Sequence, residues 1–173
     1  YEFKLFLDLN KKKKYKFIQI STDEVYGSTN KKSFKETDNF KPNSPYSSSK
    51  ASAELILRSM KKTYDFNSII LRPSNNFGPR QFHEKLIPLA IKNLKNNQKI
   101  PIYGDGSNKR EWLYVKDCVR IIYNIFNSGY NEGVFNIGSG EVISNKIIIR
   151  QLIKNYLKIT NSKNIKSKNT KYF

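Results

Sequence analysis

Short apolar runs alternate with amphipathic stretches along most of this chain. The run at 17–21 is brief and almost continuously apolar, which predicts a buried parallel strand. The run at 68–72 predicts a second strand, and the stretch at 45–64 between them predicts a long helix. Ser44 and Pro45 suit the N-cap and the first turn of that helix. Strand, helix and strand in this order predict a right-handed βαβ unit.

The same alternation continues through the second half of the chain. Asp117 and Ser144 are the expected N-caps of two further helices, because both side chains can accept hydrogen bonds from a first helical turn. The polar, Lys-rich stretch from Lys158 onward is expected to be loosely ordered. The predicted elements are a helix over 84–96, an extended piece over 101–106, a strand over 112–115, a helix over 117–127, a strand over 133–138 and a helix over 144–157.

The charge of the chain is strongly positive, but its pattern favours a solvated surface. Lys and Arg number 32 against 14 Asp and Glu, which gives a net charge of +18. Few of the basic residues are Arg, whereas proteins that read nucleic acids rely on Arg for bidentate contacts. We therefore expect no nucleic-acid partner, and keep a basic nucleic-acid-binding protein as the alternative from another functional class.

Composition also limits the class of protein. A hydrophobic fraction of 38% is sufficient for a packed core, and 173 residues suit a single compact domain. No apolar run reaches about 18 residues, so no membrane span is expected. Cys118 is the single cysteine, so no disulfide framework, thiolate zinc site or other metal site is expected. This cysteine usage and the absence of a recognisable signal peptide favour a cytoplasmic protein.

Polar residues follow the first predicted strand, at the end where ligands bind in α/β sheets. Ser21 and Thr22 lead into two adjacent carboxylates, Asp23 and Glu24. Adjacent carboxylates raise each other's pKa, so one can stay protonated as an acid while the other acts as a base. The alternative is a polar turn in which one carboxylate caps a helix.

The start of the predicted helix over 45–64 carries a second candidate for proton transfer. Tyr46 and Lys50 are four residues apart, which places them on one face of a helix, one turn apart. A phenol is a poor base at neutral pH, but a nearby ammonium stabilises its phenolate and lowers its pKa. The alternative is an ordinary surface pair.

Together these two motifs resemble the extended short-chain dehydrogenase/reductases, which act on nucleotide sugars with bound NAD. The resemblance implies a catalytic triad of Thr22, Tyr46 and Lys50. The motif Ser-Thr-Asp-Glu-Val-Tyr-Gly, which begins at Ser21, is similar to that of the dTDP-glucose 4,6-dehydratases, whose added Asp–Glu pair performs the dehydration. Related epimerases and decarboxylases usually lack this Asp, so Asp23 is the discriminating residue.

Further segments resemble the same enzymes in the same order along the chain. These segments are 72–79, 85–90, 101–104 and 110–115. The resemblance implies contacts with NAD by Ser21, Tyr46, Lys50 and Asn76. It implies contacts with the nucleotide sugar by Thr22, Asn75, Lys85, Leu86, Pro101, Tyr103, Arg110 and Asn145.

The implied fold is α/β, with part of a Rossmann-like, doubly wound parallel sheet and a smaller mixed α/β lobe that binds the substrate. We assign 1–80 to the NAD-binding domain, 81–157 mostly to the substrate lobe with a return to the sheet near 111–128, and 158–173 to a Lys-rich tail. The Gly-rich turn that would hold the NAD pyrophosphate does not occur upstream of Phe17. We therefore expect a fragment of a larger enzyme that binds NAD weakly or not at all by itself.

The implied function is dehydration of a nucleotide-activated hexose, most similar to dTDP-glucose, to a 4-keto-6-deoxy sugar through transient hydride transfer to NAD. In this reaction Tyr46, tuned by Lys50, removes the proton of the sugar 4-hydroxyl. Glu24 then removes the proton on carbon 5 while Asp23 protonates the departing 6-hydroxyl. A UDP-glucose 4,6-dehydratase, a UDP-glucuronate decarboxylase and an inactive fragment remain open. A homodimer through the helix over 45–64 is expected if the enzyme is complete.

Overall fold

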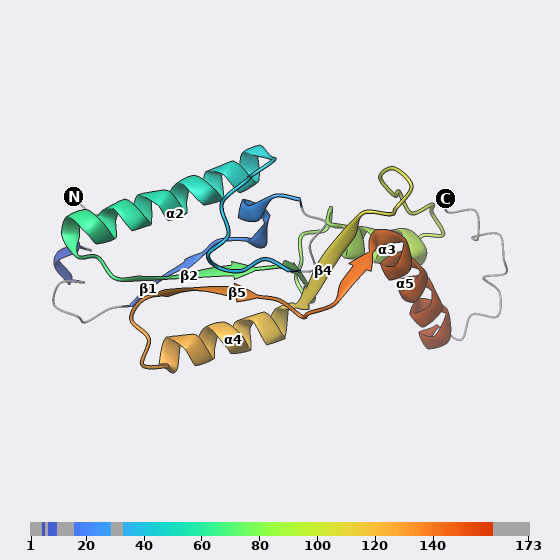
Figure 1. Ribbon diagram of the computed structural model, residues 1–173. Helices are drawn as coiled ribbons and strands as arrows, with labels where there is room; N and C mark the ends of the chain where they lie inside the picture. The colour runs from blue at the N-terminus through green and yellow to red at the C-terminus, as the bar shows by residue number, and fades with distance from the viewer. Residues whose placement is uncertain (1–4, 6, 10–15, 29–32, 161–173) are drawn as a thin grey trace.

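A three-stranded parallel sheet forms the centre of the larger lobe (Figure 1). The structure is a computed structural model that describes residues 5, 7–9, 16–28 and 33–160. Helix α2 covers one face of this sheet and α4 covers the other, which gives three layers. The strand order is β1-β2-β5, and the elements are β1 (Phe17–Ile20), α2 (Pro45–Tyr64), β2 (Ser68–Pro73), α4 (Val115–Asn127) and β5 (Gly133–Ile137).

Strand β2 is apolar on both faces because both are covered. Ile69 and Leu71 pack in one core cluster with Cys118 of α4. Ile70 points to the other face and packs with Leu57 of α2. Alternate residues of a strand point to opposite faces, so a doubly covered strand has the nearly continuous apolar run that the sequence shows at 68–72.

The smaller lobe is a mixed sheet with two helices beside it. The strand β3 (Asn75–Phe77) is parallel to β4 (Lys109–Tyr114), and β4 is antiparallel to β6 (Val142–Ser144). Ala90 and Leu94 of α3 (Leu86–Lys95) form a buried cluster with Ile149 of α5 (Asn145–Ile159). The predicted α/β class, with a parallel sheet and a small mixed sheet, is confirmed.

Two of the three predicted helix caps are present. Ser44 accepts a hydrogen bond from the backbone N–H of Ser47, and the Ser47 hydroxyl accepts one from the N–H of Ser44. Ser144 accepts from the N–H of Ile147 at the start of α5. The predicted cap by Asp117 is wrong, because α4 begins at Val115 directly after β4 and Asp117 instead pairs with Arg120.

Some short elements and one strand edge differ from the sequence-based expectation. The strands β3 and β6 have three residues each and were not predicted. Strand β1 is only partly buried, and Ile20 is 40% exposed, because β1 pairs with β2 alone among the described residues. Helix α5 continues to Ile159, two residues into the stretch expected to be loosely ordered, and 161–173 lie outside the described residues.

None of the helices in the described part of the chain is both long and apolar enough to cross a membrane.

Candidate active site

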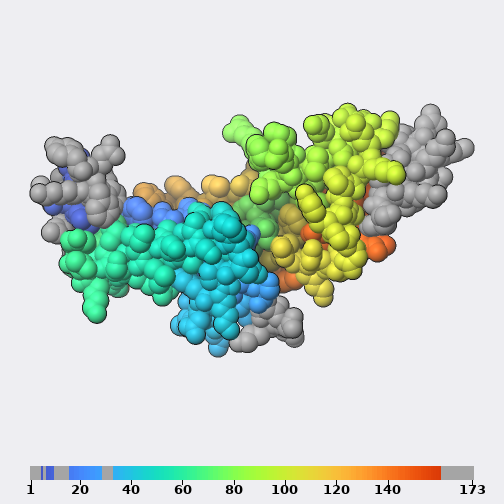
Figure 2. All heavy atoms as spheres, turned by 90° about the horizontal axis from the view of Figure 1, so that it is seen from above, coloured from blue at the N-terminus to red at the C-terminus, as the bar shows by residue number. Residues whose placement is uncertain are grey.

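The polar residues that follow β1 and β2 lie at the carboxyl ends of these strands, beside the smaller lobe. Ser21 is buried, and its backbone N–H donates to the carbonyl of Leu71 at 2.7 Å, which holds the two strand ends together. Figure 2 shows the smaller lobe in green and yellow next to the cyan start of α2. The candidate residues therefore gather where the two lobes meet.

A 3-10 helix, η1 (Asp23–Tyr26), holds the two adjacent carboxylates. Thr22 is its N-cap, since Thr22 Oγ1 accepts from the N–H of Glu24 at 3.3 Å and donates to Asp23 Oδ1 at 3.3 Å. Gly27 ends the turn with a φ of 74°, and a Cβ at this position would overlap the Lys41 carbonyl oxygen. The turn is thus fixed at both ends, and Asp23 and Glu24 have defined positions.

Helix α2 brings Tyr46 and Lys50 to the same place. Lys50 Nζ donates to the carbonyl oxygen of Ile20 at 2.9 Å and lies 6.0 Å from the centre of the Tyr46 ring. The Tyr46 side chain is hydrogen-bonded to that of Thr22, and it is half-exposed. Thr22, Tyr46 and Lys50, which the sequence places far apart, therefore form one group.

The pKa of Tyr46 differs in direction from the expectation. Burial raises it above the ordinary value of a phenol, the charge of Glu24 raises it further, and the hydrogen bond with Thr22 opposes this rise only in part. Lys50 was expected to lower this pKa. The Lys50 ammonium instead lies over the Tyr46 ring and donates to the Ile20 carbonyl, and none of the hydrogen bonds within the described residues joins it to the phenol oxygen.

Asp23 is the most strongly perturbed acid of the site. Its pKa is raised from 3.8 to about 6, mainly by burial; the charges of Glu24 and Glu111 also raise it, whereas the hydrogen bond with Thr22 and the charge of Arg110 lower it. The sequence suggested that the neighbouring carboxylate of Glu24 would be the main cause of a raised pKa at Asp23, but burial raises this pKa more. Asp23 can therefore hold its proton up to much higher pH than an ordinary Asp.

Glu111 is a residue of this site that sequence reasoning did not single out. Glu111 Oε1 accepts from the backbone N–H of Gly140 at 2.6 Å, and a Cβ on Gly138 would overlap the Glu111 carboxylate. Strand β4 thus ties the turn between β5 and β6 to the neighbourhood of Asp23. The available signal was the position of Glu111 directly after Arg110 in a segment that already matched the family.

We expect the Asp23→Asn variant to be more stable than the parent protein at neutral pH. The folded state binds a proton at Asp23 more tightly than the unfolded state, with a pKa of about 6 against 3.8. This contribution to stability is therefore complete below about pH 4 and is lost as the pH rises through about 6. Asn carries no charge and avoids that loss, so the gain should be near zero at about pH 4 and about 1–3 kcal/mol at about pH 7.

Urea unfolding at the two pH values measures this gain. The exposed Asp117→Asn variant is the control and should show no comparable pH dependence. An equal gain for Asp23→Asn at both pH values would contradict the prediction, because it would not arise from ionisation.

Several buried polar atoms near the strand ends have no hydrogen-bond partner among the described residues. Ser21 Oγ, Ser74 Oγ and Asn76 Oδ1 lie at or just after the ends of β1 and β2, and the others within the described residues are Gln81 Oε1, Trp112 Nε1 and Asn145 Oδ1 in or beside the smaller lobe. Asn76 uses its Nδ2 to donate to the carbonyl of Ser74 at 3.2 Å, which leaves its acceptor oxygen available. Buried polar groups without partners are uncommon in folded proteins, so these atoms are suited to a polar ligand.

The remaining predicted contact residues lie on the smaller lobe. The charge of Arg110 slightly lowers the pKa of Asp23, and its Nη1 donates to the Lys109 carbonyl at 3.0 Å. Tyr103 is 86% exposed, in the connection between α3 and β4. The other predicted contact residues lie on several elements. Asn75 is on β3, Lys85 and Leu86 are at the start of α3, Pro101 is in the same connection as Tyr103, and Asn145 is at the start of α5.

Comparison with known proteins places this arrangement in context. A family model described as GDP-mannose 4,6 dehydratase matches residues 3–172. The chain is 48% identical over 130 residues to the low-salt glycan biosynthesis protein Agl12 of Haloferax volcanii, covering 75% of this chain and 42% of the relative. It is 46% identical over 138 residues to the dTDP-glucose 4,6-dehydratase of Streptomyces griseus, covering 80% and 42%.

A solved structure gives the same result at the level of the fold. The dTDP-glucose 4,6-dehydratase of Bacillus anthracis in complex with NAD aligns with a TM-score of 0.80 and 46% identity, covering 86% of this chain and 49% of that one. The chain spans less than half the length of these relatives.

Proposed function

This chain belongs to the GDP-mannose 4,6 dehydratase family, and we propose that its protein is an NAD-dependent nucleotide-sugar 4,6-dehydratase that acts on dTDP-glucose. The observation that carries the proposal is the half-buried Asp23 with its raised pKa, which lies beside Glu24 and near Thr22 and Tyr46. Oxidation of a sugar hydroxyl requires a base, whereas loss of water also requires a second base and an acid that is still protonated near neutral pH. Asp23, with a pKa of about 6, keeps about one tenth of its carboxyl groups protonated at pH 7, far more than an ordinary Asp does.

NAD fits the donors and acceptors at the strand ends. Ser21 Oγ and Asn76 Oδ1 are buried polar atoms without a protein partner in the described residues, and Lys50 and Tyr46 lie beside them. We propose that these four residues hold the cofactor. When bound, NAD supplies the hydride acceptor for carbon 4 of the sugar and the hydride donor for carbon 6.

The proposed roles of the side chains follow from their positions. Tyr46, hydrogen-bonded with Thr22, removes the proton of the 4-hydroxyl, and the Lys50 ammonium over its ring stabilises the negative charge that develops. The ketone formed at carbon 4 acidifies the proton on carbon 5, and Glu24 removes that proton. Asp23 protonates the departing 6-hydroxyl, which leaves as water.

We propose that the smaller lobe holds the nucleotide diphosphate. Arg110 supports this role because its cationic side chain is exposed on β4 close to Asp23. We also propose that the chain returns to the larger lobe near 111–128, and the packing of α4 on the main sheet supports this proposal. The proposed contacts with the nucleotide sugar are Thr22, Asn75, Lys85, Leu86, Pro101, Tyr103, Arg110 and Asn145.

We propose a homodimer through α2. Leu55 and Ile56 of this helix are 54% and 59% exposed, which leaves an apolar face that a second copy could cover.

An isotope-transfer experiment tests the proposed reaction. The protein that contains this chain is incubated with NAD and dTDP-glucose deuterated at carbon 4, and the product is analysed by mass spectrometry and NMR. The expected product has lost one molecule of water, keeps its nucleotide, and carries the deuterium at carbon 6. UDP-glucose and UDP-glucuronate serve as parallel substrates. Faster turnover of either would contradict the dTDP-glucose assignment, and release of carbon dioxide or retention of deuterium at carbon 4 would contradict dehydration.

A further inference from the structure

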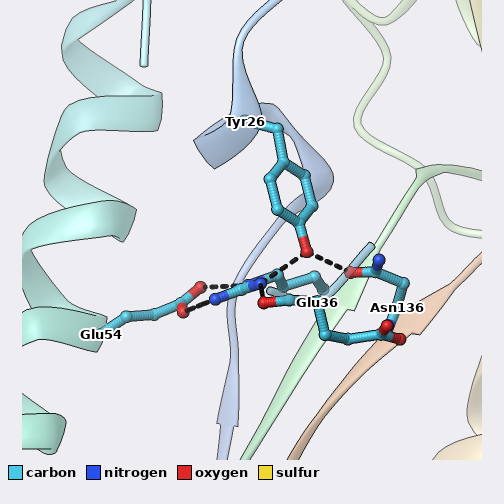
Figure 3. A network of polar contacts seen from close by, with 5 residues as sticks. Tyr26, Glu36, Glu54 and Asn136 are labelled. Carbon is cyan, nitrogen blue, oxygen red and sulfur yellow. Dashed lines mark hydrogen bonds and ion pairs between the residues drawn. The ribbon is translucent and has the colours of Figure 1, made fainter. Parts of the chain in front are cut away.

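An ion pair between Arg72 and Glu54 lies completely inside the larger lobe (Figure 3). Both side chains are fully buried, and Arg72 Nη2 lies 2.6 Å from Glu54 Oε2. Arg72 Nε also donates to both carboxylate oxygens, at 3.0 Å and 3.2 Å. Burying two charges is unfavourable unless nearly every donor and acceptor is used. The pair therefore calls for an explanation beyond stability.

The third nitrogen of the Arg72 guanidinium, Nη1, bonds to a second set of partners. Its Nη1 donates to the Tyr26 hydroxyl at 2.5 Å and to the backbone carbonyl of Glu36 at 3.1 Å. The Tyr26 hydroxyl in turn donates to Asn136 Oδ1 at 2.7 Å. The guanidinium lies 4.9 Å from the ring centres of both Tyr26 and Phe40. Hydrogen bonds therefore hold the Arg72 guanidinium within its plane, and the Tyr26 and Phe40 rings hold it by contact with the guanidinium group.

Each main partner belongs to an element that carries part of the proposed active site. Tyr26 is the last residue of η1, which begins at Asp23. Glu54 lies one helical turn after Lys50 on α2, on the same face of the helix. Arg72 itself lies near the end of β2, and β3 follows shortly after it in the chain.

We propose that Arg72, Glu54 and Tyr26 form a positioning cluster that fixes η1, α2 and the end of β2 relative to one another, and so sets the geometry between Asp23, Glu24 and Tyr46. This inference rests on the proposed dehydratase function. Apolar contacts allow small sliding movements, whereas the rigid fork of Arg bonds in fixed directions. Acid and base groups must be held to within about 0.5 Å of their productive positions, so directional bonds between their supporting elements have a direct effect on rate.

The double variant Arg72→Met/Glu54→Leu separates positioning from folding. Replacing a buried ion pair by apolar side chains of similar volume often leaves a fold equally stable or more stable. We expect a folded protein with a thermal midpoint at or above that of the parent. Its rate of water loss should fall about 10-fold to 100-fold while KM for the sugar nucleotide stays within about twofold, because the lobe proposed to bind the nucleotide is unchanged.

Tyr26→Phe is a milder test of the same cluster, because it removes one hydroxyl and keeps the ring that stacks on Phe34. The matched control is Tyr123→Phe on α4, where the side chain is 65% exposed. Tyr26→Phe should lower kcat about tenfold without a comparable change in KM, and Tyr123→Phe should change neither. A double variant that is folded and has the parent kcat would overturn the proposal.

A readout that does not depend on turnover keeps this inference separate from the proposed function. The Asp23 carboxyl is titrated by NMR in the parent and in Tyr26→Phe, with side-chain labelling of Asp. If η1 loosens, Asp23 becomes more hydrated, and its midpoint should move from about 6 toward its ordinary value. If the parent protein fails the isotope-transfer experiment but the Asp23 midpoint moves in Tyr26→Phe, only the dehydratase assignment is contradicted. An unchanged midpoint in Tyr26→Phe would contradict the positioning role.

Discussion

Replacing Asp23 with Asn is expected to slow the loss of water from the sugar about 10²-fold to 10⁴-fold, the usual effect of removing a general acid. Asn has nearly the same shape as Asp and can still accept the hydrogen bond from Thr22, so the turn that holds Glu24 should remain in place. It cannot donate a proton to the departing 6-hydroxyl. Oxidation at carbon 4, which is assigned to Tyr46, should change by no more than a few fold.

Single-turnover experiments with rapid quenching distinguish the two steps. The 4-keto form of the intact sugar should accumulate in Asp23→Asn and not in the parent protein. The control is Asp117→Asn, which removes an exposed carboxylate on α4 that pairs with Arg120. If Asp23→Asn eliminates water at the parent rate, the role given to Asp23 is wrong.

Replacing Arg72 alone with Met is expected to destabilise the protein by about 3–5 kcal/mol. The substitution leaves the Glu54 carboxylate fully buried without its cation, and removing one partner of a buried pair is far more harmful than removing both. It also removes the donor to the Tyr26 hydroxyl and to the Glu36 carbonyl. The free energy of unfolding in urea measures this effect.

The matched control for Arg72→Met is Arg120→Met, which removes an exposed guanidinium paired with Asp117. Exposed ion pairs contribute at most about 1 kcal/mol, so this variant should unfold close to the parent. Equal effects of the two substitutions would show that the surroundings of Arg72 are hydrated. The combination with Glu54→Leu should restore the free energy of unfolding to at least that of the parent protein.

The sequence was most informative where local chemistry and periodicity agreed. Helix α2 begins and ends where the pattern at 45–64 predicted, because Ser44 and Pro45 are strong start signals and the apolar face is continuous. Strand β2 was recognisable for a similar reason, since burial on both faces leaves an apolar run. Strands β3 and β6 were missed because three residues are too few to show a period.

The tertiary environment of the candidate site could be predicted only in part. The motifs identified Asp23 and Tyr46, but the burial that raises their pKa values depends on segments distant in sequence. Glu111 and Arg72 were not assigned roles for the same reason. Arg72 was predicted as the last residue of a strand, but its burial could not be predicted, because it depends on Glu54 and Tyr26 being close enough to pair with the guanidinium.

The way the chain passes between its two sheets has a consequence for how such a protein can change. The strand β2 leads through Ser74 into β3, β4 continues without a linker into α4, and β5 leads into β6. The smaller lobe is therefore assembled from separated pieces of sequence, and no single recombination event within the described residues could exchange it for another. A new ligand preference in this lobe has to arise by substitution of individual side chains. Each such substitution can also shift the strands of the neighbouring sheet, because the two sheets are joined directly through the chain.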